Sequence, residues 1–109
     1  MEITTTELKN AITQFTVFDD TSDLPLGFLW VRYAVGETGK ITALILHIMT
    51  LPCFRRKGAA RALLNESLKY ADFLITLTGS DEGGKELLQN FGFVYRKDLN
   101  MWVYLKKEG

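Results

Sequence analysis

The spacing of the apolar residues between residues 15 and 51 predicts strands. Phe15–Phe18 and Leu26–Val35 are rich in aromatic and β-branched residues, which favours strands. The turn residues Gly36–Gly39 come next, and they predict a hairpin. Ile41–Leu51 is apolar at both alternating sets of positions, which is typical of a strand buried on both faces. A buried helix is the alternative, but the β-branched residues and Pro52 favour the strand.

Two segments of the first seventy residues have the pattern of helices. Thr4 and Glu7 have the spacing of a capping box, which predicts a short helix that ends at about Gln14. Gly58–Ala71 places small and leucine side chains along one stripe. We expect this stripe to be buried: Ala60, Leu63, Leu64, Leu68 and Ala71.

The rest of the chain predicts a strand, a helix and a hairpin. Phe73–Thr78 is a strongly apolar strand, and a helix capped at residues 80–81 ends before Gly92. Val94–Arg96 and Met101–Lys106 then form a closing hairpin. The order α-β-β-β-α-β-α-β-β predicts an α/β protein with an α+β mixed sheet and helices on both faces.

Composition and charge narrow the classes of function. Lysine and arginine equal aspartate and glutamate, 13 each, so the net charge of zero gives no case for a nucleic-acid or membrane binder. Cys53 is the single cysteine and cannot form an internal disulfide, which favours a reducing compartment. No signal peptide and no apolar stretch of membrane-spanning length is visible, so we expect a cytoplasmic location.

The stretch LPCFRRKGAARALL, residues 51–64, places cations at the start of a helix. Cations are unfavourable at that end, because it carries free N–H groups and a partial positive charge. The small residues Gly58, Ala59 and Ala60 would let an anion reach the backbone, so the pattern predicts a phosphate site. A solvated basic loop beside an alanine-rich helix is the alternative. The glycines required for a Walker loop or a dinucleotide fingerprint are absent.

Four segments of the sequence resemble the Gcn5-related N-acetyltransferase (GNAT) family. Arg55–Ala60 resembles the signature Arg/Gln-x-x-Gly-x-Gly/Ala, and Ile48–Arg55 is similar to its lead-in, apolar-x-Val-x-Pro-x-x-Arg. Asp81–Phe93 resembles Asn-x-x-Ala-x-x-Leu-Tyr-x-x-x-Gly-Phe, and Leu26–Leu29 resembles a strand that opens with glycine and an aromatic residue. The motifs occur in the family's order, so the resemblance implies one acyl-CoA N-acyltransferase-like domain over residues 1–109.

The resemblance implies that the chain binds acetyl-CoA and transfers its acetyl group to an amine. The pantetheine arm would lie in a gap between the Ile41–Leu51 strand and the strand that starts near Phe73, with the diphosphate on the backbone amides of 56–60. The implied contacts are Ile48, Met49, Thr50, Arg55, Arg56, Lys57, Gly58, Ala59, Ala60 and Asp81. The implied partners are an acyl-CoA and an amine acceptor.

The sequence departs from the family where the family places its acid and base. Leu88 stands where a tyrosine often donates a proton. His47 is the candidate base, since an unperturbed histidine titrates near 6.5. It alternates with Ile48 and Thr50, so it points to the other face of the strand unless a bulge shifts the phase. The alternative for His47 is a core histidine with a structural role.

Members of the family usually have additional residues before the segment that corresponds to Thr4 onward in this sequence. A shorter beginning leaves an open acceptor site, or one that a second subunit completes, and an edge strand that invites pairing in a homodimer. Together with Leu88, this supports a second hypothesis, which is a catalytically degenerate relative. Such a protein would be a CoA-binding regulator or a structural or assembly protein, as in some tailed phages.

Overall fold

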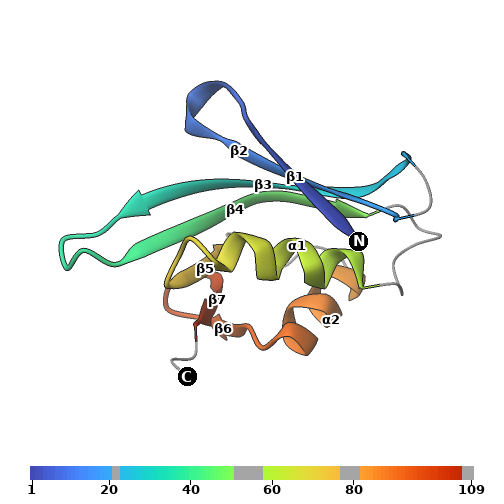
Figure 1. Cartoon of the computed structure of the whole chain (residues 1–109). Coiled ribbons are helices and arrows are strands. Elements are labelled where there is room, and N and C mark those ends of the chain that lie inside the picture. Colours follow the sequence, from blue (N-terminus) through green and yellow to red (C-terminus); the bar gives the residue numbers. More distant parts are fainter. Residues whose placement is uncertain (21–22, 51–57, 77–81, 107–109) are drawn as a thin grey trace.

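The fold is a twisted sheet with two helices, and a computed structural model describes it for residues 1–20, 23–50, 58–76 and 82–106 (Figure 1). The strands and helices have the following bounds: β1 Glu2–Glu7, β2 Thr13–Phe18, β3 Pro25–Val35, β4 Ile41–Thr50, α1 Ala59–Leu68, β5 Phe73–Thr76, α2 Glu82–Phe91, β6 Val94–Arg96 and β7 Met101–Leu105. A short 3-10 turn, Lys9–Ala11, joins β1 to β2.

All strands belong to one seven-stranded sheet in the order β1-β2-β3-β4-β5-β7-β6. The pairs are antiparallel except β4 with β5, which run parallel and are joined through α1. The mixed sheet and the element types predicted from β2 onward are therefore confirmed. The strand β1, which the sequence did not predict, lies at one edge of the sheet, and β6 lies at the other.

The helix predicted from Thr4 is wrong, because that segment forms the strand β1. Its threonines are β-branched and its backbone pairs with β2 over the full length of both strands. Glu7, which a capping box would turn toward the helix start, instead accepts a hydrogen bond from the Thr13 hydroxyl, 3.1 Å away. Thr is common both at helix caps and in strands, so the local pattern alone did not separate the two.

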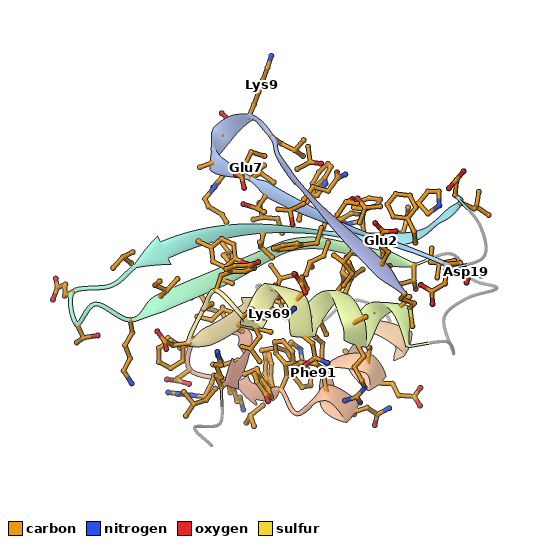
Figure 2. The ribbon with its side chains drawn as sticks, in the orientation of Figure 1. Glu2, Glu7, Lys9, Asp19, Lys69 and Phe91 are labelled. Carbon is orange, nitrogen blue, oxygen red and sulfur yellow. The ribbon has the colours of Figure 1, made fainter. Side chains whose placement is uncertain are left out.

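The prediction that helices cover both faces of the sheet is also wrong. Tyr33 lies opposite Ala43 in the ladder, and its hydroxyl donates to the Ser67 carbonyl of α1 over 3.0 Å, so Ala43 faces α1. Leu74 lies opposite Ala43 and Tyr104, and the Tyr104 ring is 4.9 Å from that of Phe91 in α2. Both helices therefore lie on one face, which we call the covered face, as Figures 1 and 2 show.

The core lies between the covered face and these helices. Its fully buried side chains come from β2, β3, α1 and β5: Phe15, Val17, Leu26, Leu29, Val31, Leu63, Leu64 and Leu74. The predicted stripe of α1 is buried as expected, from Ala60 to Ala71. At the end of α2, Gly92 adopts a φ of +118° and Phe93 packs back into the core. A glycine was predicted there because other residues are strained in that conformation.

Candidate functional site

The parallel neighbours β4 and β5 are paired in the described ranges at the first half of β4. Among the described residues, the ladder joins Thr42–Ile45 to Phe73–Thr76. Beyond Ile45, the described residues of β4 have ladder partners in β3 alone. The backbone of Ile48–Thr50 therefore has an edge that no described strand occupies, on the side where β5 lies earlier in the ladder.

A bulge in β4 follows the last described pair of this ladder. Trp30 lies opposite His47 and Val31 lies opposite Ile45, so Leu46 is an extra residue with no counterpart in β3. A bulge bends a strand and shifts which residues face the core. The sequence predicted β4 to be buried on both faces; in the structure Leu46 and Met49 are 36% and 45% exposed. That part of the prediction is wrong, because Ile48 takes the inward place after the bulge.

Gly27 fixes the far end of β4 against β3. It lies opposite Thr50, and a Cβ at this position would collide with the Met49 carbonyl oxygen. No larger residue fits without moving the β4 backbone. Gly27 belongs to the segment Leu26–Leu29, which resembles the family, and in the structure it allows close packing of β3 against β4. It holds Ile48–Thr50, which the resemblance implies as a cofactor contact, close against β3.

The start of α1 is open at its N-cap. Gly58 is the N-cap residue, with a left-handed φ of +78°, and among the described residues no side chain caps the helix. The first turn holds no acidic residue, and Ala59 and Ala60 turn their methyl groups into the core. A Cβ at Gly58 would have only the Met1 methyl within 4 Å of it, at 3.8 Å, among the atoms described. The arrangement fits an anion bound by backbone N–H groups.

Arg61 does not belong to the basic group at this helix start, although its position in the sequence suggested that it would. Its guanidinium donates to the Asn90 carbonyl over 3.2 Å and lies 5.6 Å from the Phe91 ring centre. It therefore links α1 to the C-terminal end of α2, where a cation is favourable. Other predicted contacts lie outside the described residues: Arg55, Arg56, Lys57 and Asp81.

His47 lies beside the bulge on the face opposite the helices, which we call the open face. It is exposed, and its ring centre is 5.5 Å from that of Phe28 and 5.9 Å from that of Trp30. Within the described part of the chain, the imidazole makes no hydrogen bond or ion pair that would hold it in a structural role. The alternative of a buried core histidine is therefore wrong.

Leu88 is buried in the core, with 7% of its surface exposed. The resemblance places a proton-donating tyrosine at this position in other chains. Here the side chain is apolar and packs inward, so it supplies neither a hydroxyl nor a polar edge. A transferase reaction in this protein needs another route for the leaving group's proton.

Sequence reasoning raised a bulge only as a condition for the orientation of His47 and did not predict it, and it missed the aromatic group on the open face. The aromatic residues Phe28 and Trp30 are two apart in a strand, which was a signal that they share a face. The bulge has no such signal, because apolar residues stand on both sides of it. In the structure, the bulge is marked by two consecutive exposed residues, Leu46 and His47.

Metal and membrane sites receive no support from the described residues. In the described ranges, no group of three His, Cys, Asp or Glu side chains comes together in a way that could hold a metal ion. Among the helices described, none has the length and apolar character needed to cross a bilayer.

Comparison with solved structures identifies the fold. Arabidopsis thaliana NAA60, solved with a bisubstrate analogue, matches with a TM-score of 0.68 and 16% identity over 89% of this chain and 76% of that chain. Arabidopsis thaliana Naa50, in complex with the bisubstrate analogue CoA-Ac-MVNAL, gives 0.64 and 15% over 87% and 72%. Nourseothricin acetyltransferase gives 0.62 and 20% over 86% and 64%. No family model and no curated protein matches the sequence. The chain therefore has the fold of the Gcn5-related N-acetyltransferase superfamily.

Proposed function

We propose that this chain is an acetyl-CoA-dependent N-acetyltransferase that acts on an amine. The observation that carries the proposal is the start of α1, which no described side chain caps, together with the bulge that follows the last described pair of the β4–β5 ladder. Structures with this fold support it, since NAA60 has been solved with acetyl-CoA and Naa50 with a CoA-linked peptide. Proteins with the same fold can have different functions, so the proposal depends on the local geometry of β4 and α1.

The proposed cosubstrate site uses backbone more than side chains. The N–H groups of Gly58–Ala60 would hold the diphosphate, and Arg55–Lys57 would supply charge from the chain just before the helix. The edge of Ile48–Thr50 would bind the pantetheine arm in the manner of an added strand. Asp81 is a further proposed contact, after β5 in the sequence.

His47 is the proposed general base. Its imidazole would take a proton from the acceptor's ammonium group, and the free amine would then attack the acetyl carbon. The new C–N bond forms as the C–S bond breaks, and the electron pair leaves on sulfur. The second proton lost by nitrogen ends on that thiolate through water, because Leu88 cannot deliver one. Positioning of the two reactants would supply the rest of the rate enhancement.

The buried Leu88 also favours a second candidate function. A chain without the usual proton donor can bind CoA as a regulator, or use the fold in an assembly, without turnover. Release of the CoA thiol from acetyl-CoA with a panel of amines separates the two candidates. An amine-dependent release supports the transferase, and binding without release supports the regulator.

Binding itself is tested by thermal denaturation with acetyl-CoA. At a hundred times the dissociation constant, the ligand should stabilise the fold by about 2.7 kcal/mol, a rise in Tm of roughly 10 °C. Gly58→Glu should abolish the rise, because the side chain enters the cradle and repels phosphate. A glutamate there suits the helix dipole, so the loss would not come from a weaker helix.

The matched control is Gly39→Glu in the β3–β4 hairpin. Gly39 also has a left-handed φ, +83°, and a Cβ there meets no atom within 4 Å. Both substitutions therefore impose similar backbone strain, of about 1 kcal/mol. We expect the Gly39 variant to keep the full response to acetyl-CoA. An equal loss in both variants, or no response of the unchanged protein at millimolar ligand, would remove the proposed function.

A further inference from the structure

The open face carries an aromatic group that the proposed transfer reaction does not yet use. Phe28, Trp30 and His47 stand together beside the bulge, with ring centres 5.5–5.9 Å apart and planes tilted by 40–58°. We propose that these three rings form a recognition platform for the ammonium group of a cationic acceptor. The inference rests on the proposed function, since it names the class of amine that this site would take.

The platform is held in place by a neighbouring strand. The Trp30 indole N–H donates to the Gln14 side-chain oxygen over 2.7 Å, and the Gln14 amide nitrogen donates to the Thr16 hydroxyl over 3.1 Å. Gln14 and Trp30 lie opposite each other in the β2–β3 ladder. The indole thus has a fixed orientation before a ligand arrives, which lowers the entropic cost of binding.

The platform is accessible from outside the protein. Phe28 and Trp30 are half-buried, His47 is exposed, and no helix of the described chain covers this face. Aromatic rings carry negative potential on their faces and attract ammonium groups, with Trp the strongest.

The charges around the platform suit a cation. Glu2 lies opposite Phe18 and shares the open face. Asp19 follows Phe18 in the sequence, and Figure 2 shows Glu2 and Asp19 at the same end of the sheet. Asp20 is paired with the N-terminal ammonium of Met1, 3.0 Å away, so its charge is already balanced. The cation on the far side, Arg32, is turned toward the Asn10 carbonyl in the β1–β2 turn.

The position of the platform fits the transfer step. It adjoins the bulge at Leu46, which follows the last described pair of the β4–β5 ladder and where the proposed acetyl group would lie. An ammonium bound on Trp30 and Phe28 would stand beside the imidazole that takes its proton. The acetyl donor and the acceptor would then approach the bulge from opposite faces of the sheet, which keeps their binding sites separate.

The test uses the two tryptophan indole N–H signals in a ¹H–¹⁵N spectrum, without acetyl-CoA. The probe is 2-phenylethylamine, and 2-phenylethanol is the uncharged control of similar shape. We expect a saturable shift of the Trp30 signal with the amine and a shift at least fivefold weaker with the alcohol. Trp102 is 7% exposed and faces the helices, so its signal should not move. Equal shifts with amine and alcohol, or movement of both indoles, would overturn the proposal.

Kinetics with the same amine give a second, independent readout. Trp30→Leu keeps an apolar side chain but removes the ring, so we expect KM for the amine to rise roughly threefold to tenfold with kcat nearly unchanged. Trp30→Phe should recover most of the loss. Gln14→Leu leaves the ring and frees its orientation, and should raise KM by a smaller factor. A KM unmoved by Trp30→Leu would contradict the platform.

The two proposals fail in distinguishable ways. Amine binding at Trp30 without any release of CoA thiol would support the platform and sink the transferase. Thiol release with no movement of the Trp30 signal would support the transferase and sink the platform. Leu105→Ala is the matched surface control: it is 60% exposed on the same face at the β7 end, and should change neither readout.

Discussion

The two faces of the sheet differ in what they do for the protein. The covered face presents fully buried residues such as Leu29 and Val31 to α1, whereas on the open face the neighbours Phe28 and Trp30 keep part of their surface in solvent. Residues that alternate along one strand thus divide between packing and recognition. At the Leu46 bulge, the alternation of β4 side chains between the two faces shifts by one residue. We therefore expect substitutions on the covered face to change stability and substitutions on the open face to change function.

The largest expected effect is on the covered face. Leu29→Ala removes a side chain with 0% exposure and leaves a cavity, so it should lower the free energy of unfolding by about 3–4 kcal/mol. Met49→Ala, a matched truncation on the open face of the adjoining strand, should cost less than about 1 kcal/mol because Met49 is 45% exposed. Urea denaturation measures both. Similar losses in the two variants would mean that the open face is packed in solution.

The next effect is on turnover. His47→Gln keeps a polar side chain of similar size but removes the base, so kcat for amine-dependent release of CoA thiol should fall at least about a hundredfold. Stability and the response to acetyl-CoA should not change, since His47 is exposed and lies outside the proposed cradle. A kcat within twofold of the unchanged protein would retire His47 as the base.

The smallest effect concerns the contact between β3 and α1. Burial raises the pKa of the Tyr33 hydroxyl well above its usual value near 10. The unfolded chain therefore loses this proton first, and the stability that Tyr33 contributes is complete below about pH 10 and decreases above it. Tyr33→Phe also removes the hydrogen bond to Ser67, which should cost about 1 kcal/mol at pH 7. Denaturation at pH 7 and pH 11 should show a smaller alkaline loss in the variant; an equal loss would contradict this role.

The hydrophobic pattern predicted most of the strands and both helices of the second half. β3 and β4 were recognisable because their aromatic and β-branched runs are interrupted by the turn at Gly36–Gly39. Gly92 and Phe93 marked the end of α2 because a left-handed glycine and a returning apolar residue are a local signal. Such features depend on neighbours in the sequence, and a single sequence shows them.

Features that depend on distant partners were not predictable in the same way. Thr4–Glu7 satisfies the rules of a helix start, and only its pairing with β2 makes it a strand. The placement of both helices on one face depends on how β5, β7 and α2 return across the sheet. The bulge depends on the register between β3 and β4, and it moves His47 onto the open face. The candidate cradle was visible from the sequence, but the acceptor side required the structure.

The most direct test of the central claim is amide hydrogen exchange with and without acetyl-CoA. The proposed site predicts slower exchange in two separate places, the start of α1 at Gly58–Ala60 and the β4 edge at Ile48–Thr50. The amides of Gly36 and Gly39 in the β3–β4 hairpin, at the opposite end of β4 from Ile48–Thr50, serve as the internal control and should exchange at the same rate in both samples. Protection confined to other parts of the chain, or no protection at saturating acetyl-CoA, would contradict a cosubstrate site between β4 and β5.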